Sequence, residues 1–205
     1  MPSALILIAN GTEEMEFTIP YDTLVRAGID CTSAFVPSES EVGLAYAGGW
    51  GINDVTVTCS RGVRIVADTT LEALLAEPTP KVYDIVIVPG GAKGAETLSQ
   101  SVQVQRLITD QYSAGKLVGM ICAGSLAAKT SKLPSQPLTS HPSVKKDLES
   151  SFEYKEDSVV VSGSLITSRG PGTAFPFAFK IVELLCGEAK VKEVRSPMIF
   201  PAGVF

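Results

Sequence analysis

Residues 116–124 read Lys-Leu-Val-Gly-Met-Ile-Cys-Ala-Gly, an apolar run that ends at a cysteine followed by two small residues. An unbroken apolar run is typical of a strand buried on both faces of a parallel sheet. Small residues after Cys122 favour a tight turn, and helix-forming residues follow over Ala123–Lys129. The stretch therefore predicts a strand that turns directly into a helix at Cys122, the repeating unit of open α/β sheets.

The same pattern recurs along the chain. The further predicted strands are Ala4–Ala9, Asp30–Val36, Lys81–Val88, Ser158–Val161 and Leu165–Thr167. The further predicted helices are Glu14–Ala27, Val102–Ala114 and Phe175–Cys186, each followed by a glycine that can end it. We predict an α/β fold, a doubly wound, mostly parallel sheet with helices on both faces, in one domain spanning 1–205.

Residues 37–54 do not follow this pattern. They read PSESEVGLAYAGGWGIND, are rich in Gly and Ser, and contain the only tryptophan, Trp50. We interpret them as an inserted long loop or extended hairpin that holds Trp50 partly against the protein; a solvated loop is the alternative.

Charge and hydropathy exclude two classes of partner. The net charge of −5 comes without a block of basic residues, which argues against nucleic acid. The longest apolar runs, such as Ala4–Ala9, are far shorter than the ~20 residues that cross a bilayer, so no membrane partner is expected. The N-terminus lacks the basic start of a signal peptide. We expect a cytoplasmic protein, with the nucleus left open.

The four cysteines are widely separated and form no C-x-x-C pair. They are Cys31, Cys59, Cys122 and Cys186. This spacing favours neither a disulfide framework nor a zinc site, so we predict no metal and no organic cofactor. Most of these thiols should act as small core side chains.

Three segments should meet where the site of an open α/β sheet forms, at the carboxyl ends of the strands. They are Asn10–Glu16, Pro89–Gly94 and Cys122–Ser125. Cys122 resembles the residue of a nucleophile elbow, and a helix N-terminus there would favour its thiolate. The alternative is a structural cysteine that happens to end a strand.

The backbone N–H groups of Gly90, Gly91 and Ala123 could form an oxyanion hole near that thiol, although Pro-Gly-Gly also ends many ordinary strands. Glu16 could act as acid and base. A thiolate neighbour and burial should then both raise its pKa, so that Glu16 is protonated near neutral pH. The alternative for the run 13–16 is a solvated helix start.

His141 is the only histidine of the chain, in Ser-His-Pro. It could form a dyad with the cysteine or serve only as a capping residue.

Seven stretches together resemble the DJ-one/ThiJ/PfpI superfamily, in its branch of Parkinson disease protein seven. They are Asn10–Glu16, Arg26–Gly28, Cys59–Arg61, Val88–Ala95, Ile121–Gly124, His141–Pro142 and Thr167–Thr173. The resemblance implies a flavodoxin-like fold, a homodimer, and a site in which Cys122 is the nucleophile and Glu16 its partner carboxyl. It also implies roles for Gly90, Gly91 and Ala123 as oxyanion donors, for His141 as the active-site histidine, and for Arg61 near the site across the dimer.

Two departures from the motifs of this superfamily argue against protease and amidotransferase activity. The protease-like branch has a histidine directly after its cysteine, where this chain has Ala123. Related amidotransferases use His-x-Glu, but His141 is followed by Pro142 and Ser143. The segment 37–54 also exceeds what the branch usually carries.

The resemblance implies a glutathione-independent glyoxalase that converts methylglyoxal and related 2-oxoaldehydes to 2-hydroxy acids such as lactate. Its alternatives are an oxidative-stress redox sensor, a holdase chaperone and a protein deglycase, all of which use the same cysteine.

Overall fold

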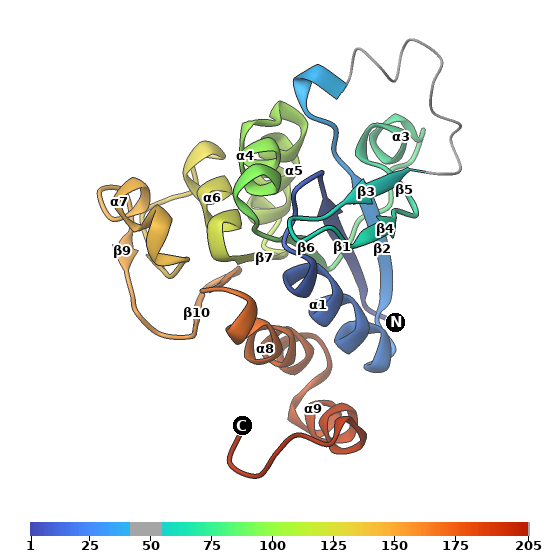
Figure 1. Cartoon of the computed structure of the whole chain (residues 1–205), viewed down its shortest axis with the longest axis vertical. Coiled ribbons are helices and arrows are strands. Elements are labelled where there is room, and N and C mark those ends of the chain that lie inside the picture. The colour runs from blue at the N-terminus through green and yellow to red at the C-terminus, as the bar shows by residue number, and fades with distance from the viewer. Residues whose placement is uncertain (42–54, 205) are drawn as a thin grey trace.

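The computed structural model describes residues 1–41 and 55–204 of the chain. Its central sheet has the strand order β10-β11-β7-β6-β1-β2-β5, and only β10 runs antiparallel to its neighbour. Figure 1 shows β1, β6 and β7 near the centre of the molecule. The strands are β1 (Ser3–Ile8), β2 (Asp30–Phe35), β5 (Thr69–Thr70), β6 (Ile85–Val88), β7 (Leu117–Ile121), β10 (Val159–Ser162) and β11 (Leu165–Ser168). The predicted doubly wound, mostly parallel sheet is confirmed.

Helices lie on both faces of this sheet, and α7 and α9 pack outside them against other helices (Figure 1). The helices are α1 (Glu14–Arg26), α3 (Leu71–Ala76), α4 (Ala92–Gln100), α5 (Val102–Ser113), α6 (Leu126–Thr130), α7 (Lys145–Leu148), α8 (Ala174–Cys186) and α9 (Glu188–Arg195). Two small sheets lie outside the central one: the hairpin β3 (Thr56–Thr58) and β4 (Arg64–Val66), and the pair β8 (Pro137–Leu138) and β9 (Glu153–Tyr154).

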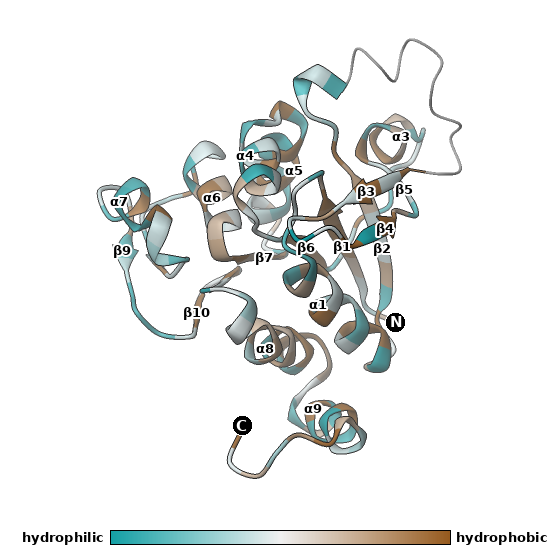
Figure 2. Cartoon of the chain, in the orientation of Figure 1, coloured by the Kyte–Doolittle hydropathy of each residue, from teal (hydrophilic) through white to brown (hydrophobic). Residues whose placement is uncertain are grey.

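Successive side chains of the central strands point to opposite faces of the sheet, which divides the core into two layers. Ile6 of β1 packs in one layer with Phe177 of α8, and Leu7 packs in the other with Leu98 of α4. All four side chains are fully buried. Figure 2 shows the resulting apolar strands at the centre of the molecule. Burial on both faces explains why these strands read as continuous apolar runs.

The strand order reverses direction between β1 and β6. From β1 the chain crosses to β2 on one side, whereas β6 and β7 lie on the other side. The crossover connections that follow β1 and β6 therefore run in opposite directions, and such a switch point is where open α/β sheets form their sites. The segment that follows β7 begins at Cys122, one strand away.

The structure differs from the sequence-based prediction at several elements. Strand β6 begins at Ile85 rather than Lys81, because Lys81 and Val82 are exposed. Helix α4 was not predicted, since its sequence carries few apolar residues. Helix α9 was missed because Gly187, expected only to end α8, also precedes the first turn of α9.

The predicted insertion at 37–54 falls largely on residues 42–54, including Trp50, which lie outside the described residues. Within the described ranges, no helix combines the length and apolarity needed to cross a membrane.

Candidate active site

The loops after β1 and β6 touch through a glycine. Gly91 has φ +87°, in the left-handed region that side chains rarely adopt, and a Cβ there would fall onto the backbone of Gly11 and Glu13. The Glu13 N–H donates a hydrogen bond to the Gly90 carbonyl at 3.0 Å. Glycine at position 91 is therefore what lets the two loops pack together at the switch point.

Cys122 occupies a strained turn directly after β7. Its φ is +62°, unusual for a residue other than glycine, and its side chain is 9 % exposed. The expected helix over Ala123–Lys129 instead begins as a 3-10 turn, Cys122–Ser125, and continues as α6. The His141 N–H donates to the Cys122 carbonyl at 3.3 Å, which ties the turn to the segment before α7.

Glu16 projects from the first turn of α1 and is fully buried. Its Oε2 accepts a hydrogen bond from the Gly90 N–H at 2.9 Å. A Cβ on Gly90 would lie 2.5 Å from that oxygen and 3.0 Å from the Cys122 sulfur. The absence of a side chain at Gly90 thus lets the carboxyl and the thiol share one small space, where they interact directly.

Burial raises the pKa of Glu16 to about 7, with the charge of Glu13 acting in the same direction. Hydrogen bonds from the Cys122 thiol and the Gly90 N–H act in the opposite direction. The direction agrees with the sequence-based expectation. The leading cause, however, is removal of the carboxyl from water rather than repulsion by a thiolate.

The thiol itself differs from the expectation that a helix N-terminus stabilises its thiolate. Burial raises the pKa of Cys122 to about 12, and the charge of Glu16 adds to that effect. The N–H groups of Ala123 and Gly91 act the other way. Because two buried acids in contact titrate as a pair, a thiolate here requires the proton on Glu16.

We expect the pKa of Glu16 to make the folded protein less stable as pH rises. A carboxyl that titrates near 7 when folded, and near 4.5 when unfolded, keeps its proton better in the folded state between those values. That contribution is full below pH 4.5 and is lost as pH rises through about 7. Relative to Glu16→Gln, which stays neutral, the free energy of unfolding should fall by about 2 to 3 kcal/mol between pH 5 and 8. Urea denaturation of both proteins at the two pH values measures this, and parallel pH profiles would contradict it.

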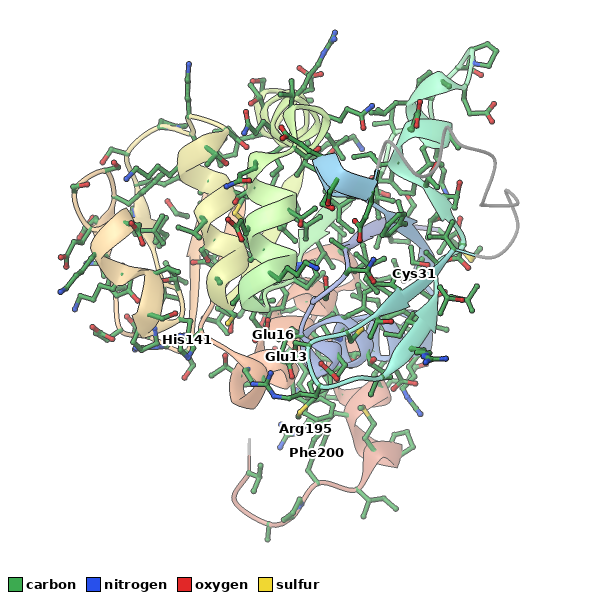
Figure 3. The ribbon with its side chains drawn as sticks, turned by 45° about the horizontal axis from the view of Figure 1, so that its top comes forward. Glu13, Glu16, Cys31, His141, Arg195 and Phe200 are labelled. Carbon is green, nitrogen blue, oxygen red and sulfur yellow. The ribbon has the colours of Figure 1, made fainter. Side chains whose placement is uncertain are left out.

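His141 is exposed, and its backbone is hydrogen-bonded to the Cys122 turn. Figure 3 shows where His141 lies relative to Glu16. Its Nδ1 accepts from the Ser143 N–H at 3.2 Å and lies 2.8 Å from the Ser143 hydroxyl. With Nδ1 used as an acceptor, the neutral ring carries its hydrogen on Nε2, an assignment that rests on these hydrogen bonds. His141 therefore caps the 3-10 turn Pro142–Val144, which is the capping role that the sequence allowed as the alternative. Its Nε2–H is also a hydrogen-bond donor beside the Cys122 turn.

Arg61 lies in the turn between β3 and β4 and its side chain is exposed. Its backbone N–H donates to the Glu14 carboxylate at 2.8 Å, while its guanidinium donates to the Ser60 carbonyl. A position near the site across a dimer stays a prediction.

Sequence reasoning missed Glu14 as a positioning residue. Its buried carboxylate also accepts from the Ser60 hydroxyl at 2.9 Å, and the Ser60 N–H donates to the Thr12 carbonyl at 2.8 Å. Burial alone would raise the pKa of Glu14, but these hydrogen bonds bring it below its usual value. Glu14 thus holds the β3–β4 hairpin against the loop that carries Glu16.

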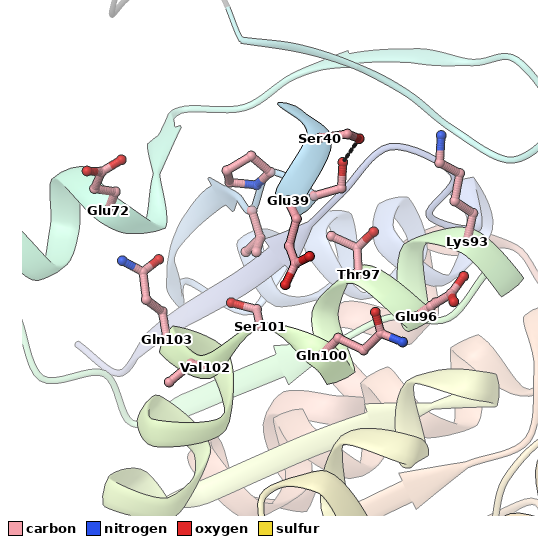
Figure 4. A pocket seen from close by; sticks show the side chains of 13 residues that line it. Glu39, Ser40, Glu72, Lys93, Glu96, Thr97, Gln100, Ser101, Val102 and Gln103 are labelled. Carbon is pink, nitrogen blue, oxygen red and sulfur yellow. Dashed lines mark hydrogen bonds between the residues drawn. The ribbon is translucent and has the colours of Figure 1, made fainter. Parts of the chain in front are cut away.

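Among the described residues, no group of three His, Cys, Asp or Glu side chains could hold a metal ion. A groove of about 610 Å³ opens at a different place, between residues 36–40 and 93–103 (Figure 4). Cys122, Glu16 and His141 do not line it. The chemistry-bearing side chains therefore form a small, separate site.

Comparison with known proteins places these residues in a family. The family model described as DJ-1/PfpI matches residues 2–184. Protein dj-1beta of Drosophila melanogaster is 40% identical over 96% of this chain and 96% of its own length. A protein named glutathione-independent glyoxalase DJ-1, from Schizosaccharomyces pombe, is 37% identical over 98% of this chain and all of its own.

Solved structures agree. The crystal structure of Drosophila melanogaster DJ-1beta superposes with a TM-score of 0.83 at 40% identity, covering 98% of each chain. The solved structure of Schizosaccharomyces pombe DJ-1 superposes with a TM-score of 0.83 at 35% identity, covering 97% of this chain and all of the other. The strand order, the thiol at its strained turn and these similarities over nearly the whole length agree that the chain belongs to the DJ-1/PfpI family.

Proposed function

We propose that this protein is a glutathione-independent glyoxalase that converts methylglyoxal and related 2-oxoaldehydes to 2-hydroxy acids. The observation that carries the proposal is the buried Glu16, with a pKa of about 7, in direct contact with the Cys122 thiol. A carboxyl that titrates near neutral pH can both take and return a proton. Relatives from Schizosaccharomyces pombe and Caenorhabditis elegans carry the name glutathione-independent glyoxalase.

The reaction needs no external oxidant, since one carbon is oxidised while its neighbour is reduced. The Cys122 sulfur adds to the aldehyde carbon of methylglyoxal and its proton passes to the oxygen, which gives a hemithioacetal. Glu16 removes the hydrogen from that carbon to form an ene-diol and returns a proton to the ketone carbon. The product is a thioester of lactate on Cys122, and water cleaves it to lactate and the free thiol.

Two backbone donors would stabilise the oxygen charge that develops during addition. The N–H groups of Ala123 and Gly91 both lie against the Cys122 sulfur. The Gly90 N–H donates to Glu16 at 2.9 Å, so in this proposal Gly90 orients the carboxyl and leaves the oxyanion hole to Ala123 and Gly91. The hole therefore has two donors, a number sufficient for acyl chemistry in other enzymes.

In this proposal His141 donates from Nε2 to the ketone oxygen of the substrate, because its Nδ1 is committed to Ser143. The donated hydrogen bond would draw charge from the ketone carbon as the ene-diol forms.

Formation of lactate from methylglyoxal by the purified protein, without glutathione, tests the proposal. We expect steady lactate production with neither metal nor organic cofactor added. No lactate from a folded protein would overturn the proposal. Peroxide oxidation confined to Cys122 in that same inactive protein would then favour the redox-sensor alternative.

We further propose a two-fold homodimer with α1 and the region around Arg61 at or near the contact. Helix α1 exposes Met15 and Val25, which are 48 % and 49 % exposed and apolar. Two-fold dimers are the commonest symmetric assemblies. Light scattering at micromolar concentration should give twice the mass of one chain, and a monomeric mass would contradict the expectation.

A further inference from the structure

A small gap lies between His141 and Glu16, over Gly170. Gly170 is buried, and a Cβ built on it would meet only the His141 Cδ2 at 3.7 Å and the Glu16 Oε1 at 4.0 Å. Both are ordinary van der Waals distances. Its φ of 172° is extended backbone that any residue adopts. Nothing in the fold therefore requires glycine at this position, and a methyl group would fit there without strain.

The segment that carries Gly170 is held firmly. The Thr173 hydroxyl oxygen accepts from the N–H groups of Arg169 and Gly170, at 3.1 and 3.0 Å, and lies 2.7 Å from the Ser168 hydroxyl. The gap therefore has one wall whose backbone is fixed by its own hydrogen bonds.

The opposite wall is linked to the same segment. Glu156 pairs with Arg169, next to Gly170, and also with Lys145, in the helix that follows the His141 turn. Each pair is partly exposed and contributes modestly to stability. Together these ion pairs connect the segment that carries Gly170 with the segment that follows His141. The distance between the two walls of the gap is therefore held by these ion pairs.

The floor of the gap is a polar atom with no partner. Among the described residues, nothing forms a hydrogen bond to the Glu16 Oε1, although that oxygen is fully buried. A buried acceptor without a partner is costly, and a bound molecule is one way to satisfy it. The other oxygen of the same carboxyl faces Gly90 and Cys122. A substrate attached to the sulfur would thus extend past Glu16 toward Gly170.

We propose that Gly170 is the specificity-determining residue of this site. Its missing side chain leaves the space for the substituent on the ketone carbon of the 2-oxoaldehyde, and the His141 ring limits that substituent to a small one. This inference rests on the proposed glyoxalase function. It predicts that adding carbon atoms at position 170 selects against substrates in proportion to the size of the substituent.

The test compares three 2-oxoaldehydes on Gly170→Ala and Gly170→Val. Glyoxal has no substituent, methylglyoxal has a methyl and phenylglyoxal has a ring. For Gly170→Ala, the ratio of kcat/KM for methylglyoxal to that for glyoxal should fall by about 10-fold or more. Valine should lower the ratio further, and phenylglyoxal should be lost first. Unfolding midpoints should stay near that of the wild type.

Gly172→Ala is the matched control. Gly172 lies in the same loop but is exposed, and a Cβ there meets nothing within 4 Å. Its kcat/KM ratios should equal those of the wild type. Equal losses for all three substrates in Gly170→Ala, or unchanged ratios, would overturn the inference.

A second readout separates this inference from the proposed function. If the wild type converts no 2-oxoaldehyde, the proposed function fails, but the gap can still be probed by alkylation of Cys122. Peptide mass spectrometry at Cys122 would follow iodoacetamide and the bulkier N-ethylmaleimide. Gly170→Val should slow the bulkier reagent more, and equal slowing of both would overturn the inference.

Discussion

Replacing Cys122 with alanine should abolish turnover of methylglyoxal, a loss of about 10⁴-fold or more. Without the sulfur no hemithioacetal forms, and the hydrogen on the aldehyde carbon is never brought next to Glu16. The fold should survive, because alanine adds no atoms to a nearly closed site and the turn at Cys122 is held by backbone hydrogen bonds, including that from His141. Lactate formation and urea denaturation measure the two outcomes on the same preparation.

Cys59→Ala is the matched control for the loss of a buried thiol. Cys59 is 4 % exposed, and burial raises its pKa to about 11, so it shares the setting of Cys122 without a carboxyl partner in contact. We expect its turnover to stay close to that of the wild type. Activity that survives in Cys122→Ala, or disappears in Cys59→Ala with the fold intact, would show that Cys122 is not the nucleophile.

The sequence was a good guide to those parts of the fold that depend on local pattern. Ala4–Ala9 and Leu117–Ile121 are apolar because helices cover both faces of the sheet, so their composition alone identified β1 and β7. At Cys122 the sequence predicted a helix over Ala123–Lys129, whereas the structure has a 3-10 turn first. The left-handed φ of Cys122 could not be predicted, because residue type alone does not signal it. The place of Cys122 directly after a strand predicted the tight turn, but not the left-handed backbone conformation of that turn.

The three glutamates near the site show where sequence reasoning stops. Glu13 caps α1 by accepting from the Glu16 N–H at 2.9 Å. Glu14 binds the β3–β4 hairpin, whose residues are more than 40 positions away in the chain. Glu16 is enclosed by Gly90 and Cys122. Nothing local distinguishes three acidic residues in one helix start, since their environments come from segments that only the folded chain brings together.

Those environments also explain why one carboxyl suits acid–base chemistry and its neighbour does not. Hydrogen bonds keep Glu14 ionised, and burial keeps Glu16 near its titration point. Glu16 reaches that state at a cost to stability, as does the strained turn at Cys122. Local strain and an uncompensated buried acid are typical of sites selected for reactivity rather than for stability.

Glu16→Gln should lower turnover of methylglyoxal by about 10²- to 10⁴-fold, the usual contribution of general acid–base catalysis. Glutamine keeps the shape of the side chain, can accept from the Gly90 N–H as Glu16 does at 2.9 Å, and can donate to the Cys122 sulfur. It cannot carry a proton from one carbon to the next, so the hemithioacetal should form and then stop.

The matched control for this exchange is Glu13→Gln, which keeps an acceptor for the α1 cap and removes one charge near Glu16. Its turnover should stay within a few-fold of the wild type, since the proton-transferring group is intact.

Peroxide should still convert Cys122 to the sulfinate in Glu16→Gln, because the amide can donate a hydrogen bond to a sulfinate oxygen. Near-normal lactate formation by Glu16→Gln would refute the acid–base role. A glyoxalase would then need another base, and His141 is a second titratable group beside the Cys122 turn. Loss of turnover with sulfinate formation retained would instead separate two uses of one thiol: catalysis needs a group that exchanges protons, whereas the oxidised sulfur needs only a hydrogen-bond donor.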